Sequence, residues 1–144
     1  APEVILGVPY GTPLDMWAAG CTLYELYTGT ILFPGKTNND MLRLQMELKG
    51  KVSSKIIRKA AIRNEYFDEN MNFLYQDVDA VTGNDVIKEI AHIKPAKTIH
   101  QLLEGRLELS PYEQEWESLF ADVLERMLMT DPDKRITVSE ALRH

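Results

Sequence analysis

Cysteine, clustered histidine and glycine-rich stretches are all scarce in this sequence. Cys21 is the single cysteine among 144 residues, so no disulfide can form within the chain, and a reducing intracellular compartment is expected. His92, His100 and His144 show no metal-ligand spacing with one another or with Cys21. No glycine-rich phosphate cradle and no Ser/His/Asp arrangement is recognisable. We therefore expect these residues to bind no metal and to form no catalytic centre by themselves.

Long apolar runs and an excess of positive charge are also missing. No run reaches the length of a membrane span and no signal peptide is recognisable, so no membrane partner is expected. A net charge of −6 argues against direct nucleic-acid binding, which favours basic domains. The hydrophobic content of 44% is that of an ordinary globular chain, long enough to bury a core. The abrupt start at Ala1-Pro2-Glu3, without a methionine, suggests a piece of a longer protein.

What the chain does contain is one unusually apolar segment, from Thr12 to Gly29. Asp15 and Glu25 are its only charged residues. A helix with almost no polar face is expected to be surrounded by the rest of its domain, and about 17 residues is short for a membrane span. Thr12 as the N-cap, Pro13 at the first helical position and Asp15 as a capping-box acid predict where this helix begins. Gly29 predicts where it ends.

The rest of the sequence predicts a mainly α fold. Residues 1–11, rich in proline and glycine, are expected to form an ordered loop, and residues 30–35 a turn that packs Leu32 and Phe33 onto the core. Helices are predicted at 38–49, 53–63 and 98–103, with Ser53 or Ser54 capping the second, while 71–78 fits either an extended segment or a turn of helix. Residues 81–84 predict a turn. Capping boxes at Ser110 and Thr137 open two further helices. The first of these carries an apolar stripe: Trp116, Leu119, Phe120, Val123, Leu124, Met127 and Leu128.

Four short motifs stand in a characteristic order along the chain. They are APE at 1–3, DMWAAG at 15–20, LFPG at 32–35 and DPDKR at 131–135. In this order and spacing they closely resemble the eukaryotic protein kinase family, from its A-P-E motif onwards. The resemblance covers essentially residues 1–144. It implies part of the C-terminal lobe of the kinase-like α+β fold, mainly helical and built around the buried helix at 12–29.

The resemblance also implies roles for individual side chains. Glu3 is expected to form a largely buried ion pair with Arg135, which ties the end of the activation segment to the loop before the last helix. Asp15 is expected to accept hydrogen bonds from the backbone of a catalytic loop. Trp17 and Gly20 are expected to pack the central helix against the substrate-binding segment. These five residues would support an active site from below rather than take part in catalysis.

Simpler interpretations of the same residues exist. Glu25 matches a position that reads basic residues in the substrates of some kinases. Taken without the four motifs, Asp15 is only a capping-box acid, and Glu3 and Arg135 are solvated surface charges, as most glutamates and arginines are. Trp17 is a core residue in either interpretation. The presence of all four motifs favours the roles that the kinase resemblance implies.

The parts of a kinase that carry out phosphoryl transfer are not in this sequence. Transfer needs a glycine-rich loop, a strand lysine, a catalytic-loop Asp and Asn, and a DFG aspartate that holds magnesium. In kinases all of these precede the A-P-E motif. The resemblance therefore implies ATP and Mg²⁺ as cofactors of a parent Ser/Thr kinase. It implies no catalytic residue in this segment and no cofactor bound by it alone.

One part of the chain points to a particular group of kinases. The LFPG motif and the long stretch at 50–109, which we interpret as a group-specific insert, resemble the proline-directed (CMGC) group of cyclin-dependent, MAP and dual-specificity kinases. Within that group, residues 24–51, 53–60 and 67–79 look most like a kinase of the spliceosome. This implies a nuclear enzyme whose partners are protein substrates, in particular splicing factors. Ala18, where many relatives have serine, is a small departure.

The predicted insert has a charge pattern of its own. Residues 49–63 contain bases and no acid, and residues 65–85 contain acids and no base. Lys51, Lys55, Arg58 and Lys59 are expected on one helical face, a candidate docking surface for an acidic or phosphorylated partner. The alternative is a solvated face whose charges are satisfied by the acidic stretch beside it.

Three functions are compatible with these patterns. The first is the C-lobe portion of an active kinase that transfers the γ-phosphate of ATP to protein Ser/Thr. The second is a pseudokinase or scaffold that only binds partners. The third is an unrelated helical domain, in which Glu3 and Arg135 would lie far apart.

Overall fold

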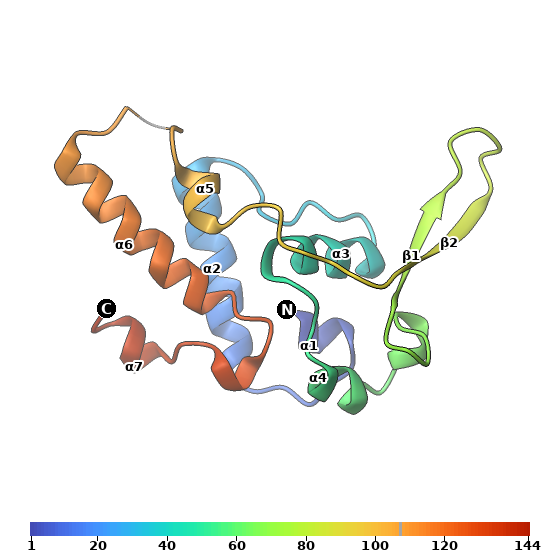
Figure 1. Cartoon of the computed structure of the whole chain (residues 1–144). Coiled ribbons are helices and arrows are strands. Elements are labelled where there is room, and N and C mark those ends of the chain that lie inside the picture. Colours follow the sequence, from blue (N-terminus) through green and yellow to red (C-terminus); the bar gives the residue numbers. More distant parts are fainter. Residues whose placement is uncertain (107) are drawn as a thin grey trace.

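Helices dominate the architecture, as the sequence predicts. The computed structural model describes residues 1–106 and 108–144 (Figure 1). Within these ranges, no helix has both the length and the apolar character needed to cross a bilayer. In chain order the elements are α1 (Pro2–Ile5), α2 (Pro13–Thr28), α3 (Asn38–Lys49), α4 (Ser54–Lys59), the 3₁₀ helix η1 (Arg63–Glu65), β1 (Phe73–Val78), β2 (Asp85–Ile90), α5 (Ile99–Leu103), α6 (Pro111–Met127), the 3₁₀ helix η2 (Pro132–Lys134) and α7 (Val138–Ala141).

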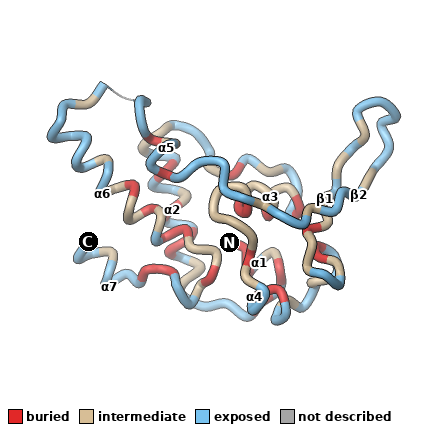
Figure 2. The backbone as a smooth tube through the Cα atoms, viewed as in Figure 1, coloured by how far each residue is buried: buried red, intermediate tan, exposed pale blue. Residues whose placement is uncertain are grey.

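Buried apolar side chains gather in two clusters, visible as two groups of buried segments in Figure 2. The first cluster lies where α2, α5 and α6 pack together. It contains Met16, Trp17, Tyr24, Phe33, Ile99, Leu103, Ala121, Leu124, Met127, Leu128 and Ile136. The second cluster lies among the residues after α1, helices α3 and α4, and the start of β1. It contains Leu6, Val8, Leu42, Met46, Val52, Ile56, Ile57, Tyr66, Phe67 and Phe73.

The ends of α2 fall where the sequence predicts, but the N-terminal cap differs. Thr12 has helical backbone angles, and its side chain makes no capping hydrogen bond. Thr12 is the N-cap residue, as predicted, but the capping box with Asp15 is wrong, because the helical rather than extended backbone angles of Thr12 do not present its hydroxyl to the following amides. Gly29 is left-handed, with φ of 70°, and its N–H donates to the carbonyl of Glu25 at 2.8 Å. This confirms the predicted C-terminal end.

Helix α2 is buried on one side only. Met16, Trp17, Gly20 and Tyr24 are buried against α6 and η2, whereas Leu26 is 77% exposed on the opposite side. The prediction that the helix is surrounded within this chain is wrong. No element among residues 1–106 and 108–144 covers its second apolar side.

The N-terminal segment and α4 also differ from the sequence predictions. Residues Pro2–Ile5 form α1 where a loop was predicted, with proline at the first helical turn, where its missing N–H costs nothing. Helix α4 ends at Lys59, earlier than the predicted 53–63. Ser53 occupies its N-cap position, but its hydroxyl is buried and has no hydrogen-bond partner among the described residues.

The capping boxes predicted at Ser110 and Thr137 are confirmed, since each residue opens a helix with both hydrogen bonds of the box. The helix predicted at 98–103 is present as α5, and Thr98 opens it with a capping box that was not predicted. The predicted helix at 38–49 coincides with α3. Along α6, however, Trp116 and Leu119 are 57% and 44% exposed. The buried face runs instead through Ala121, Leu124 and Met127, because the first half of α6 extends past the first cluster.

Residues 73–90 form a β-hairpin that projects from the helical body (Figure 1). Its antiparallel register runs from Phe73 opposite Ile90 to Val78 opposite Asp85. The segment at 71–78, left open between strand and helix, is thus a strand, and the turn at 81–84 lies at the hairpin tip. The strand at 85–90 was not predicted. None of its residues is buried, so the sequence lacks the alternation of apolar and polar residues that would indicate a strand. The strand is formed by its pairing with β1.

A buried asparagine fastens the hairpin to α3. The Asn39 side chain is 3% exposed; its amide donates to the Leu74 carbonyl at 2.8 Å, and its oxygen accepts from the Gln76 N–H at 3.0 Å. The amide group thereby takes the place that a neighbouring strand would occupy along the outer edge of β1.

Replacing Asn39 by alanine should loosen the base of the hairpin. Two backbone groups of β1 would lose their partner, at a cost of about 1–3 kcal/mol for a buried unsatisfied group. Hydrogen exchange should show a faster-exchanging amide at Gln76. The amide of Leu74, which donates to the Tyr66 carbonyl at 2.8 Å, is the internal control. Equal acceleration at both amides would mean that the whole hairpin had detached instead.

Candidate functional site

Arg135 is the centre of the most completely buried polar site in the described chain. Its two terminal nitrogens donate to the Glu3 carboxylate, at 2.7 Å (Nη1 to Oε1) and 3.1 Å (Nη2 to Oε2). Nη1 also donates to the Pro13 carbonyl at 2.6 Å, and Nε to the Met129 carbonyl at 3.0 Å. The side chains of Arg135 and Glu3 are 0% and 1% exposed. A bidentate, dry pair of this kind is held by geometry as well as by charge.

The positions of these groups follow from the elements that carry them. Glu3 sits in the single turn of α1, and Pro13 opens α2. Arg135 directly follows η2, where the Asp131 carboxylate accepts a capping hydrogen bond from the Asp133 N–H at 3.1 Å. The ion pair therefore connects three separate stretches of the chain.

Trp17 forms the floor of this site. Its ring lies 5.2 Å from the guanidinium carbon of Arg135 and stacks on Phe33, with ring centres 5.7 Å apart and planes inclined by 13°. Trp17 is 3% exposed. The contact adds a cation–π term to the ion pair in a place shielded from water. It also links the LFPG motif to the DPDKR motif through one aromatic stack.

Gly20 marks the closest approach of α2 to α6. A methyl group at this position would lie 3.1 Å from Cβ of Met127 and 3.2 Å from Cδ2 of Leu128. A side chain here would force Met127 or Leu128 to shift by a few tenths of an ångström, in a core that has little free volume. Glycine therefore permits the close packing seen at this point.

Asp15 and Glu25 point to solvent from α2. Both are exposed, and neither side chain makes a hydrogen bond or an ion pair within residues 1–106 and 108–144. Asp15 lies in the first turn of the helix, beside the buried site but not part of it. The structure thus brings Glu3, Arg135, Trp17 and Gly20 to one side of α2 and leaves Asp15 and Glu25 available to other groups.

The basic residues of the predicted insert are only partly as expected. Lys55, Arg58 and Lys59 share the exposed side of the short helix α4, but Lys51 precedes the helix and donates to the Ala91 carbonyl at 3.2 Å. Lys55 donates a hydrogen bond to Asp133 at 2.8 Å; this bond, and then the opposite charges, raise the pKa of Lys55 and lower the pKa of Asp133. Its partner is therefore the DPDKR motif and not the acidic stretch at 65–85.

Sequence reasoning missed a second polar connection between the clusters. Lys49, at the end of α3, pairs with the Glu125 carboxylate and donates to the Glu125 carbonyl at 3.0 Å. The other oxygen of that carboxylate accepts from the Ile99 N–H at 2.7 Å, at the start of α5. Glu125 thus connects α3, α5 and α6. No sequence signal could have found this group, because its members are distant along the chain and each looks like an ordinary surface charge.

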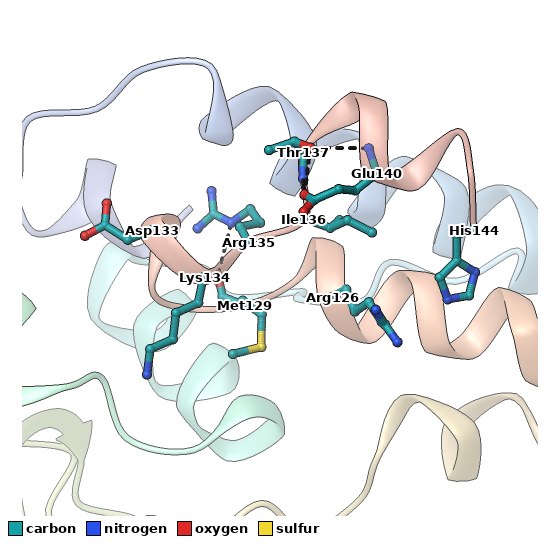
Figure 3. A pocket seen from close by; sticks show the side chains of 9 residues that line it. All are labelled: Arg126, Met129, Asp133, Lys134, Arg135, Ile136, Thr137, Glu140 and His144. Atoms are coloured by element: carbon teal, nitrogen blue, oxygen red, sulfur yellow. Dashed lines mark hydrogen bonds between the residues drawn. The ribbon is translucent and has the colours of Figure 1, made fainter.

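An open pocket of about 520 Å³ adjoins the ion pair (Figure 3). Its wall includes Arg126, Lys134, Arg135 and His144, and the capping pair of Thr137 and Glu140. The Arg135 side chain is directed out of this pocket toward Glu3, and its Nε donates to the Met129 carbonyl, another residue of the pocket wall. The pocket is the outer surface of the loop that holds Arg135.

No group of three or more His, Cys, Asp or Glu residues in 1–106 and 108–144 is placed to hold a metal ion. Burial raises the pKa of the Cys21 thiol, which disfavours the thiolate that metals bind. The arrangement is suited to holding three stretches of chain in register.

Comparison with known proteins identifies the family to which the chain belongs. The sequence profile of the protein kinase domain family matches residues 1–144, and the chain belongs to the protein kinase family. The close Glu3–Arg135 contact agrees with this and rules out the unrelated helical domain, for which the two residues would be far apart.

Individual relatives show which kinases the chain is most similar to among those compared. Over its whole length the chain is 44% identical to serine/threonine-protein kinase prp4 of Schizosaccharomyces pombe and 41% identical to serine/threonine-protein kinase prpf4B of Dictyostelium discoideum. It is 34% identical to the dual specificity tyrosine-phosphorylation-regulated kinase mbk-2 of Caenorhabditis elegans. The kinase that residues 24–51, 53–60 and 67–79 are expected to resemble most is the one called pre-mRNA processing factor four, and the identity to prp4 and prpf4B confirms this likeness. The chain spans 30% of the first relative and 18% of the other two.

Breaking the ion pair should destabilise the protein strongly. Arg135→Met leaves the Glu3 carboxylate buried without a partner, and Glu3→Gln leaves the guanidinium uncompensated; each should cost about 3–5 kcal/mol. Chemical denaturation measures the loss. Lys55→Met, which removes the exposed ion pair with Asp133, is the matched control and should leave the denaturation midpoint unchanged. Similar losses in all three variants would contradict the special role of the buried pair.

Adding a side chain at Gly20 should separate α2 from α6. Gly20→Val should cost about 1–3 kcal/mol through overpacking against Met127 and Leu128. Ala19→Val places the same side chain one residue earlier, on the exposed side of the helix, and controls for the lower helix propensity of valine. A larger loss for Gly20→Val than for Ala19→Val indicates overpacking, because valine has a better helix propensity than the glycine it replaces and a worse one than alanine. Equal midpoints would show that the helices can move apart freely.

Proposed function

We propose that residues 1–144 are part of the C-terminal lobe of a Ser/Thr kinase that transfers the γ-phosphate of ATP to protein substrates. The observation that carries the proposal is the match, over the whole chain, to two kinases named as serine/threonine-specific. The ordered APE, DMWAAG, LFPG and DPDKR motifs support it. So does the exposed apolar side of α2, which the remainder of a kinase domain would cover.

In this proposal the buried site is a scaffold for catalysis carried out elsewhere in the protein. Glu3 and Arg135 hold the end of the activation segment against the loop after α6, and Trp17 and Gly20 fix α2 beneath it. Asp15, exposed at the start of α2, is free to accept hydrogen bonds from the backbone of a catalytic loop. Glu25, further along the exposed side, is placed to meet basic residues of a substrate.

ATP and Mg²⁺ belong to the parent kinase in this proposal. Their ligands in kinases are a glycine-rich loop, a lysine and two metal-binding side chains, none of which is found in these 144 residues. Residues 1–144 by themselves should therefore neither bind ATP nor transfer phosphate.

The substrate class that we propose is splicing factors, and the location is the nucleus. Both rest on the likeness to prp4 and prpf4B, which exceeds the likeness to mbk-2. The insert at 50–109 would be the surface that distinguishes this group. Within it Arg58 and Lys59 are exposed and form no ion pair among the described residues, whereas Lys55 is engaged by Asp133. A docking contact for acidic or phosphorylated partners would therefore centre on Arg58 and Lys59.

Kinetics of the full-length protein test these roles. With MgATP and a splicing-factor substrate, Asp15→Asn should lower kcat about ten-fold, equivalent to ~1.4 kcal/mol, without a comparable loss of stability. Glu25→Gln, on the same side of α2, should instead raise KM for substrates that contain basic residues and leave kcat unchanged. Full activity of Asp15→Asn would remove the proposed support of the catalytic loop.

The alternative is a pseudokinase or scaffold that binds partners through this surface. It predicts that the full-length protein captures splicing factors but transfers no phosphate to them under any MgATP concentration. Detectable transfer that is lost with a non-hydrolysable ATP analogue would exclude this alternative.

A further inference from the structure

The projecting hairpin has one strand edge that is covered and one that is open. On β1 the Leu74 N–H donates to Tyr66, and the Gln76 N–H donates to Asn39, so both point away from β2. In an antiparallel pair, residues alternate between those bonded to the partner strand and those facing outward. The outer edge of β1 is thus occupied at Leu74 and Gln76 by groups from the protein body.

The same alternation identifies the outward-facing residues of β2. Because Leu74, Gln76 and Val78 face away from β2, their partners in register, Glu89, Ile87 and Asp85, face away from β1. The turn agrees with this assignment of outward-facing residues. The Asp79 N–H donates to the Asn84 carbonyl at 2.9 Å, so Asp79 and Asn84 are a bonded pair and the next pair, Val78 and Asp85, faces outward. The peptide groups of Asp85, Ile87 and Glu89 therefore form an edge with no partner among residues 1–106 and 108–144.

The side chains beside that edge carry a specific chemistry. Residues 85, 87 and 89 alternate with their neighbours, so Asp85, Ile87 and Glu89 lie on one face of the hairpin, together with Val78. Ile87 is 67% and Val78 57% exposed, and both carboxylates are exposed. Lys88 lies on the other face, where it is paired with Asp77. Every second residue along the open edge thus presents, in order, the acid Asp85, the aliphatic Ile87 and the acid Glu89.

The charges beside the edge favour some pairing segments over others. A second copy of β2 would set carboxylates against carboxylates, which destabilises a cross-strand pair. A segment with basic residues two positions on either side of an aliphatic residue would place opposite charges beside Asp85 and Glu89. It would also pair its aliphatic side chain with Ile87. Charge and register both favour a basic extended peptide.

We infer that β2 is a docking edge for an extended, basic–aliphatic–basic segment of a protein partner, which adds a third strand to the hairpin. The segment would exchange backbone hydrogen bonds with Asp85, Ile87 and Glu89, as in other cases of strand addition. The base of the hairpin is suited to bear it, because Phe73 is fully buried, Asn39 holds β1, and Arg43 stacks on Tyr75 at 4.9 Å. The inference is independent of phosphoryl transfer.

A synthetic peptide tests the edge directly. The probe is the capped heptapeptide TRTVTRT, and the control is TTRRVTT, which has the same composition but cannot place both arginines on one face. With the full-length protein, calorimetry should show binding of the probe at least about ten-fold tighter than the control, or ~1.4 kcal/mol. Hydrogen exchange should show new protection at the amides of Asp85, Ile87 and Glu89. The amides of Val86 and Lys88, already bonded to β1, should change little.

Two variants separate strand addition from simple charge attraction. Ile87→Pro removes an outward N–H without removing a bond to β1, so it should weaken the probe about ten-fold or more while the hairpin stays formed. Ile87→Thr keeps that N–H and should retain most of the binding. Asp85→Asn with Glu89→Gln should abolish the preference of the probe over the control.

Other outcomes would overturn the inference. Equal binding of both peptides, or unchanged binding to Ile87→Pro, would mean that the hairpin only attracts positive charge. Self-association in sedimentation experiments that Ile87→Pro abolishes would show a second copy on the edge instead. Absence of any binding by the probe would show that the edge takes no such peptide.

Discussion

The buried guanidinium of Arg135 is the constraint on which the rest of this structure depends. The first apolar cluster lies under α2, α5 and α6, and the second lies around α1, α3 and α4. Arg135 binds Glu3 on the side of the second cluster, and it binds the Pro13 carbonyl and the Trp17 ring on the side of the first. A charge placed in so dry a position is tolerable only when all its donors are satisfied. Arg135 therefore helps to hold the two clusters in one relative position, together with the second connection that Lys49 and Glu125 make.

Helix α2 divides two tasks between its sides. Its buried side carries Trp17 and Gly20, whose ring and missing side chain set the contacts with Arg135 and α6. Its exposed side carries Asp15 and Leu26, which find no partner in the described chain. This division explains why the segment is apolar all round in sequence and yet half-exposed here. In the proposed kinase, the buried side of α2 would contact Arg135 and α6, and the exposed side would contact the remainder of the kinase domain.

Helix caps that are complete within a few residues could be predicted from the sequence, whereas contacts between distant elements could not. Ser110 and Thr137 open helices where their hydroxyl and the glutamate three positions later dictate, because a capping box is complete within four residues. The partners of Glu125 and Asn39 depend on how distant elements pack, so no pattern announces them. Glu3 and Arg135 were paired in advance only through the family resemblance. The exposure of Trp116 was misjudged because periodicity shows that a helix has an apolar face, but not what covers it.

The separation of Glu3 from Arg135 along the chain has a consequence for biosynthesis. The two residues are 132 positions apart, so a ribosome adding about 5–20 residues per second emits the second roughly ten seconds after the first. Throughout that interval Glu3 lacks the partner that it has in the folded chain, and α1 cannot make its contact with Arg135. The helices with self-contained caps can form as they emerge, but the two clusters lock together only near the end of this segment's synthesis. Nascent chains that stall within this window would expose both clusters, and they would be natural clients for chaperones.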